Sequence, residues 1–131
     1  MSADLEHAAA LAALRMWVAA LNGYGDRTKT ALAVADTVVV ERGGFGAERG
    51  QVVQTIAGTE AVNTWLAMTR HVVIFFADEA SLRRDGPGWS VRYRLTAPDE
   101  FVGGGSWLFA VDDSGRIVRL QHWPDDLPAD T

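Results

Sequence analysis

Apolar residues recur with a helical period at the start of the chain and then give way to strand-forming residues. Between positions 3 and 21 they are spaced three or four apart, at Leu11, Leu14, Val18 and Leu21. This spacing predicts an amphipathic helix that Asn22-Gly23 ends. Asp26 can cap a second, shorter helix, and the β-branched run at positions 38–40 predicts the first strand.

The rest of the chain predicts one more helix and a run of strands. Gly58-Thr59 opens a helix that carries Val62, Trp65 and Leu66 on one face. Beyond Arg70, four strand-like segments are separated by short turns: residues 71–83, 89–97, 104–111 and 116–123. Short turns between consecutive strands indicate an antiparallel sheet. Helices followed by such a meander are typical of the α+β class, in which helices cover one face of the sheet.

The glycine-rich segment at positions 43–50 follows the first strand and has two interpretations. It can be a lid, in which Phe45 covers an apolar ligand, or a hairpin bend that its glycines permit. The segment has neither a Gly-Lys-Ser/Thr ending nor a G-x-G-x-x-G pattern that opens a helix. A phosphate-binding loop is therefore not favoured.

Composition describes one ordinary domain. The chain has 131 residues, of which 48% are apolar, and 17 acidic residues against 12 basic ones give a formal charge of −5. This length predicts a single domain over residues 1–131. The segment PDDLPADT, which follows Trp123, indicates a flexible tail at 124–131. The absence of cysteine excludes thiol nucleophiles, thiolate metal sites, iron–sulfur clusters and disulfides.

Charge and hydropathy limit the partners. The basic residues are scattered among acidic ones and form no patch, which argues against binding to nucleic acid. No apolar run approaches the length of a membrane span, so we expect no membrane insertion. Asp4 and Glu6 stand where a secretion signal has basic residues, and we expect a cytoplasmic protein.

Four segments in this order resemble the nuclear transport factor 2-like superfamily and, within it, the SnoaL-like branch. They are "NGYGD", "LAVADTVVVER", "IAGTEAVNTWL" and "DDSGRIVRLQHWPD". The resemblance covers nearly the whole chain and implies three helices packed on a strongly curved, mainly antiparallel sheet. In that family the sheet and helices form a cone around an apolar cavity, and members usually pair through the outer sheet face. The resemblance therefore implies a cavity for a small apolar molecule and a homodimer.

The resemblance also allows one known activity to be checked. Ketosteroid isomerase, a member of this superfamily, uses a carboxylate base, a tyrosine and a protonated aspartate. The matching positions here hold Arg42, Val18 and Trp107. An arginine cannot be the base at neutral pH, and valine and indole cannot replace a phenol and a carboxylic acid in polarising a dienolate oxygen. We therefore exclude steroid isomerisation by that mechanism.

Strand alternation and the family's inward face give candidate site residues. Residues two apart on a strand share a face. The positions expected to face inward are Val38, Val40, Arg42, Val91, Tyr93, Leu95, Gly105, Trp107, Phe109, Val118, Leu120 and His122. On the last strand this leaves Ile117, Arg119, Gln121 and Trp123 on the opposite face.

Three polar residues of the inward set can form a site. His122 is the candidate acid or base, Tyr93 the hydrogen-bond donor and Arg42 the clamp for an anion. The residues expected to bind substrate are Arg42, Val40, Trp107, Phe109, Leu120, Val18 and Phe45. Each polar candidate also has a structural interpretation: His122 as a satisfied core histidine, Tyr93 as a core aromatic, and Arg42 as a surface partner of Glu41 or Glu48.

Other motifs add no chemistry. The histidines at positions 7, 71 and 122 have no metal-ligand spacing, and Asp112-Asp113 lies in a turn that lacks the alternating ligands of a calcium loop. No nucleotide, haem or flavin motif is present, so we expect no cofactor and no metal. The tryptophans at 65, 89, 107 and 123 are more typical of a core or a dimer face than of ligand stacking.

Two functions follow from these candidates. The first is an enzyme that acts on an apolar organic molecule by cofactor-free acid–base catalysis, through cyclisation, isomerisation or dehydration. The second is a dimeric ligand-binding or accessory domain of the same fold without catalysis. A buried carboxylate within hydrogen-bond reach of His122 or Tyr93 would favour the enzyme over the binding domain. Glu41 and Asp36 are the candidates for this carboxylate.

Overall fold

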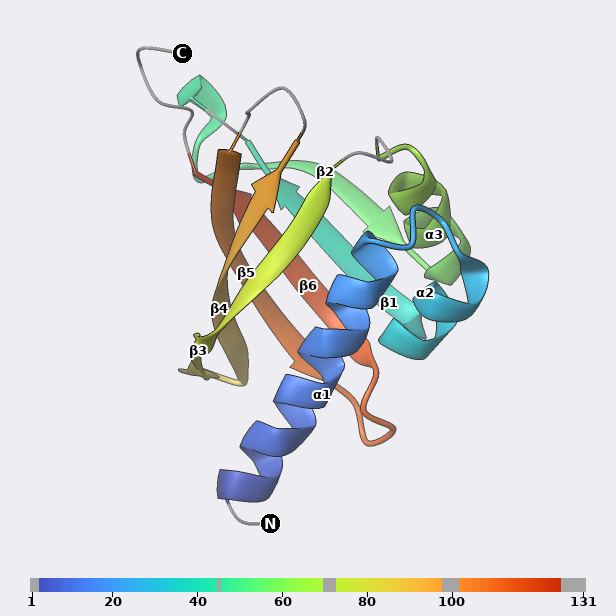
Figure 1. Cartoon of the computed structure of the whole chain (residues 1–131), viewed down its shortest axis with the longest axis vertical. Coiled ribbons are helices and arrows are strands. Elements are labelled where there is room, and N and C mark those ends of the chain that lie inside the picture. Colours follow the sequence, from blue (N-terminus) through green and yellow to red (C-terminus); the bar gives the residue numbers. More distant parts are fainter. Residues whose placement is uncertain (1–2, 45, 70–72, 98–101, 126–131) are drawn as a thin grey trace.

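Three helices and a six-stranded sheet make up the fold in a computed structural model that describes residues 3–44, 46–69, 73–97 and 102–125. The helices are α1 (Ala3–Leu21), α2 (Arg27–Ala33) and α3 (Thr59–Ala67). The strands are β1 (Val34–Gly43), β2 (Val52–Ala57), β3 (Ile74–Asp85), β4 (Gly88–Thr96), β5 (Val102–Val111) and β6 (Ile117–Pro124). Helix α1 lies across the sheet, and α2 and α3 lie beside the end of β1 (Figure 1). The predicted α+β class is confirmed.

The helices form where the sequence predicts them, and their ends have physical causes. The Asp26 carboxylate accepts a hydrogen bond from the Lys29 backbone N–H at 3.1 Å and so caps α2. Gly58, which precedes α3, has a φ of 92°, a conformation that glycine adopts without steric cost. Helix α1 buries one face, which includes Leu14, Trp17 and Leu21.

The strand order in the sheet is β2-β1-β6-β5-β4-β3. Only β1 and β6 pair in parallel, and the other neighbours pair antiparallel, so the sheet is mixed and mainly antiparallel. This order places β4, β5 and β6 side by side. Side chains from three separate parts of the sequence therefore share one face of the sheet.

Strand β2 was not predicted. Its antiparallel pairing with β1 shows that the glycine-rich segment turns a hairpin, in agreement with one of its two interpretations. Phe45 lies outside the described residues. In β2 only Ile56 is buried, because this strand forms the edge of the sheet. Because burial does not alternate along β2, its sequence lacks the alternation of apolar and polar residues that predicts a strand.

A bulge changes the predicted faces of β6. Ala110 pairs with Arg119 but Val111 pairs with Ile117, so Val118 is the extra residue. Ile117 is fully buried and Val118 only partly, which reverses the prediction for these two positions. Beyond the bulge the prediction holds, since Leu120 is fully buried.

Aromatic side chains occupy the interior between the helices and the sheet. Trp17 and Trp107 are fully buried and meet edge to face at 6.4 Å, and the Tyr93 ring stacks on Trp107 at 4.4 Å. Phe75 packs against both Tyr93 and Trp107. The expectation of a strongly curved cone is not met, because the sheet is twisted rather than strongly curled (Figure 1).

The segment predicted to be a flexible tail begins in regular structure. Pro124 ends β6, and the Asp125 backbone N–H donates to the Gly104 carbonyl at 2.8 Å. The Asp125 carboxylate also pairs with Arg92 on β4. Residues 126–131 lie outside the described part of the chain. Within that part, no helix is both long and apolar enough to cross a membrane.

Candidate functional site

The structure brings the two predicted catalytic residues into contact across β5, from β4 and β6. Tyr93 Oη lies 3.0 Å from His122 Nε2, and Trp107 Nε1 donates a hydrogen bond to His122 Nδ1 at 2.9 Å. His122 on β6 is the register partner of Trp107 on β5. The interior site therefore comprises Tyr93, Trp107 and His122.

Gly105 allows Tyr93 to reach across β5. It is the register partner of Tyr93 on that strand. A Cβ at this position would lie 2.7 Å from Tyr93 Oη and 2.3 Å from the Trp123 carbonyl oxygen, both closer than packed atoms come. The missing side chain thus leaves room for the phenol to approach His122.

Hydrogen bonding determines the protonation of His122. An indole N–H can only donate, so Nδ1 of His122 must accept and carries no proton. In the neutral ring the proton is then on Nε2 and is donated to Tyr93 Oη. Burial, with a smaller contribution from the charge of Arg42, lowers the pKa of His122 from 6.5 to about 4, so the ring is neutral near pH 7.

Tyr93 stays protonated in the same environment. Burial, followed by the charge of Asp125, raises the pKa of Tyr93 above its usual value of 10.0. The neutral phenol is a hydrogen-bond donor, while both nitrogens of His122 are already engaged. The geometry suits donation to a ligand by Tyr93 better than proton abstraction by His122.

No buried carboxylate meets this pair within the described ranges. Glu41 accepts hydrogen bonds from Arg119 and Gln121 at 3.1 and 3.2 Å, and Asp36 is exposed. The buried polar residues in the described structure are Thr30 and Asn63, whose side chains bond to each other at 2.7 Å. No group of three potential metal ligands occurs among the residues described.

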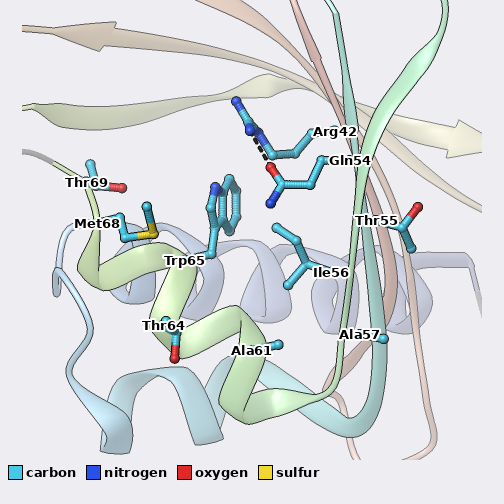
Figure 2. A pocket seen from close by; sticks show the side chains of 10 residues that line it. All are labelled: Arg42, Gln54, Thr55, Ile56, Ala57, Ala61, Thr64, Trp65, Met68 and Thr69. Carbon is cyan, nitrogen blue, oxygen red and sulfur yellow. Dashed lines mark hydrogen bonds between the residues drawn. The ribbon is translucent and has the colours of Figure 1, made fainter.

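A pocket of about 530 Å³ lies between α3 and the β1–β2 hairpin (Figure 2). Its lining residues are Arg42, Gln54, Thr55, Ile56, Ala57, Ala61, Thr64, Trp65, Met68 and Thr69. The Arg42 guanidinium donates to Gln54 Oε1 at 2.5 Å and lies 5.7 Å from the centre of the Trp65 ring. The lining contains a cation and no acidic residue.

Trp65 separates this pocket from the interior site. On one side, Trp65 lines the pocket and faces Arg42 and Gln54 (Figure 2). It also stacks on Trp17 at 6.4 Å and presents an edge-to-face contact to His122 at 6.3 Å. Trp65 is therefore the wall that the pocket and the interior share.

The predicted binding residues divide between these two places. Arg42 lines the pocket, whereas the others that the structure describes belong to the core or pack against it: Val40, Trp107, Phe109, Leu120 and Val18. Sequence reasoning missed Gln54, because its strand was not predicted, and treated Trp65 as core or dimer face. The position of Trp65 on the apolar face of its helix carried no separate signal for a pocket.

Comparison with known proteins identifies the fold. No family model and no curated protein matches the sequence. A structure provisionally assigned as an isomerase of the SnoaL-like family from Agrobacterium tumefaciens matches with a TM-score of 0.70 and 17% identity over 90% of this chain and 98% of that one. The chain has the NTF2-like fold.

Two further structures share the NTF2-like fold with this chain. An NTF2-like protein of unknown function from Mesorhizobium loti has a TM-score of 0.67 and 19% identity, over 88% of this chain and 90% of that one. Δ5-3-ketosteroid isomerase from a Mycobacterium species has a TM-score of 0.62 and 21% identity, over 88% and 92%. At these identities the likeness concerns the fold, and the chemistry has to be argued from the side chains.

Proposed function

We propose that this domain binds small, mainly apolar organic anions in the pocket beside α3, and that it acts as a binding or accessory domain. The observation that carries this proposal is the Arg42 guanidinium over the Trp65 ring, with a neutral amide as its polar partner. An arginine without a carboxylate partner in a partly apolar pocket attracts a planar carboxylate.

Electrostatics supports an anionic ligand. The chain has a formal charge of −5, yet the pocket lining includes a cation and no acid. Arg42 has no ion pair with any residue that the structure describes, whereas Arg15, Arg84, Arg92 and Arg119 each pair with a carboxylate. A bound carboxylate would therefore not have to displace an acidic side chain of the described structure from Arg42.

The apolar part of the lining supports a ligand with a flat hydrophobic body. Trp65 offers a ring face, and Ile56 and Met68 lie near it in the pocket. Met68 is 79% exposed, so a ligand that covers its side chain removes apolar surface from water. Thr55, Thr64 and Thr69 also line the pocket, and the Thr64 hydroxyl donates to the Glu60 carbonyl at 3.0 Å.

Calorimetric titration with 2-naphthoate and with its neutral amide tests this proposal. We expect the carboxylate to bind at least about tenfold more tightly than the amide to the unmodified protein. Arg42→Gln should abolish this preference, and Arg15→Gln, which removes a charge from an exposed ion pair on α1, should preserve it. Equal affinities for carboxylate and amide would contradict the proposal.

An acid–base enzyme is the second candidate, favoured by the contact between Tyr93 and His122 in a fold shared with a ketosteroid isomerase. Here Tyr93 would donate its proton to a substrate carbonyl or epoxide oxygen. Incubation with enones and epoxides, followed by mass spectrometry, tests it. Turnover that Tyr93→Phe abolishes would favour the enzyme, and no conversion would favour the binding domain.

We also propose that two copies pair through the outer face of the sheet. On β3 the side chains of Ile74 and Phe76 point away from the core and are 44% and 46% exposed. Apolar side chains on an open sheet face favour association. Sedimentation equilibrium should give a dimer that Phe76→Lys dissociates, and a monomeric unmodified protein would contradict this part.

A further inference from the structure

The hydrogen bond between Arg42 and Gln54 determines which way the Gln54 amide faces. A guanidinium group has only donors, so the amide oxygen of Gln54 must be the acceptor. The amide nitrogen, which carries two N–H donors, then lies on the other branch of the amide. Figure 2 shows this nitrogen on the side of Trp65 and Ile56, two other lining residues of the pocket. Arg42 therefore orients Gln54 as a second hydrogen-bond donor to the pocket.

Backbone pairing holds these two side chains together as well. Arg42 on β1 and Gln54 on β2 are register partners in the antiparallel hairpin. Side chains directly opposite each other on antiparallel strands leave the same face of the sheet and lie in contact. The relative position of the two donors is thus determined both by strand register and by their own hydrogen bond.

This end of the pocket offers donors and no free acceptor from the pair. Within the described structure, the Gln54 amide nitrogen has no hydrogen-bond partner, and Arg42 donates to Gln54 alone. The amide oxygen, which is the one acceptor of the pair, is already used. The lining also contains no carboxylate. A ligand that binds here meets N–H groups from both side chains.

We propose that Gln54 determines the specificity of the pocket and selects 2-oxo carboxylates with a flat apolar body. This inference rests on the proposed function, because Arg42 has to bind the carboxylate group. Guanidinium N–H groups that Gln54 does not use bind both carboxylate oxygens. The Gln54 amide then donates to the oxo oxygen on the adjacent carbon, while the Trp65 ring packs against the apolar body.

The same arrangement disfavours 2-amino carboxylates. An ammonium group has only donors, and beside the bound carboxylate it faces the charge of Arg42 and the N–H groups of Gln54. An unsubstituted carboxylate avoids this conflict but leaves the Gln54 amide without an acceptor. The expected order of affinity is therefore 2-oxo acid first, unsubstituted acid second and 2-amino acid last.

Calorimetric titration with 2-naphthylglyoxylate, 2-naphthylacetate and 2-naphthylglycine tests this order. These ligands share a ring and differ at the carbon beside the carboxylate, which carries an oxo group, two hydrogens or an ammonium group. We expect the oxo acid to bind about three- to tenfold more tightly than 2-naphthylacetate, as one hydrogen bond allows, and the amino acid to bind most weakly. Gln54→Leu should make the oxo acid and 2-naphthylacetate equal. Gln51→Leu, which removes an exposed amide outside the pocket lining, should preserve the preference.

Gln54→Glu is a second test, because it replaces the amide donor by an acceptor. The new carboxylate would repel an oxo acid and accept a hydrogen bond from an ammonium group. We expect this variant to lose the preference for 2-naphthylglyoxylate over 2-naphthylglycine. Gln54 is exposed on the edge strand β2, so both variants should unfold close to the temperature of the unmodified protein.

The titrations separate a failed role for Gln54 from a failed anion pocket. Equal affinities for 2-naphthylglyoxylate and 2-naphthylacetate would overturn the role of Gln54, even where 2-naphthoate binds more tightly than its amide. An oxo preference that persists in Gln54→Leu would also overturn it, because another group would then be the donor. If 2-naphthoate binds no more tightly than its amide, both the anion pocket and its selectivity fail.

Discussion

The interior site and the pocket beside it differ in charge although they share a wall. In the interior, burial lowers the pKa of His122 to about 4 and raises that of Tyr93, so both are neutral. In the pocket, the Arg42 guanidinium has a neutral amide as its partner. Arg42 and His122 are register partners on β1 and β6. On the proposals above, these neighbouring residues would favour different ligand groups, because Arg42 lines the pocket and His122 contacts Tyr93 and Trp107.

The difference implies two kinds of recognition on either side of Trp65. The positive charge of Arg42 would attract an anion over a long range, toward the pocket beside α3. A neutral donor such as the Tyr93 hydroxyl would instead recognise an uncharged oxygen by direction and distance. Changes on the two sides should accordingly affect different properties.

The largest expected effect is on stability, from loss of an interior ring. Trp107→Ala should lower the free energy of unfolding by about 3–5 kcal/mol, because it opens a cavity and leaves His122 Nδ1 without its donor. Trp65→Ala, at the partly buried wall, should cost less. Urea unfolding measures both, and equal losses would contradict the distinction between core and wall.

The next effect is a pH dependence that belongs to His122. Its pKa is lowered from 6.5 to about 4, so between these values the unfolded chain binds a proton that the folded chain does not. The free energy of unfolding should fall as the pH drops from 6.5 to 4, by about 3 kcal/mol in total. His122→Gln lacks this contribution and still has the other two histidines. Parallel stability curves for the two proteins would refute the lowered pKa.

Gly105→Ala should have an intermediate effect. The added methyl group would meet Tyr93 Oη at 2.7 Å and the Trp123 carbonyl oxygen at 2.3 Å, so the strands or the phenol must move. We expect a loss of about 1–3 kcal/mol in chemical denaturation, together with a weakened Tyr93–His122 contact. A variant as stable as the unmodified protein would show that this close approach is not needed.

The smallest expected effect on stability is at the pocket. Arg42→Gln should change the free energy of unfolding by no more than about 0.5 kcal/mol, because Arg42 makes no ion pair with a described residue. Thermal unfolding without ligand measures this. A large loss would mean that Arg42 supports the fold, and the case for a ligand-binding arginine would fail.

The sequence was sufficient for elements with a strong period and insufficient where pairing decided the outcome. Helix α1 was predicted from its apolar spacing, and the cap at Asp26 from its residue type. The edge strand β2 buries only Ile56 and gave no period. The bulge at Val118 depends on the register between β5 and β6, which a single strand's sequence does not contain.

The same limit applies to the candidate site. A shared inward face of the sheet predicted that Tyr93 and His122 would converge, and they do, across β5. The Trp107 hydrogen bond that directs the histidine proton was not predicted, because it depends on side-chain geometry. The pocket combines Arg42 with Gln54 and Trp65, so it could not be found before β2 and α3 were placed.

The protonation of His122 at pH 5.5 tests the account most directly. An exposed histidine is mostly charged at this pH. Nitrogen-15 spectra should instead show a neutral ring with its proton on Nε2 and an unprotonated Nδ1 facing Trp107. A charged ring, or a proton on Nδ1, would contradict the neutral interior and the donor role of Tyr93.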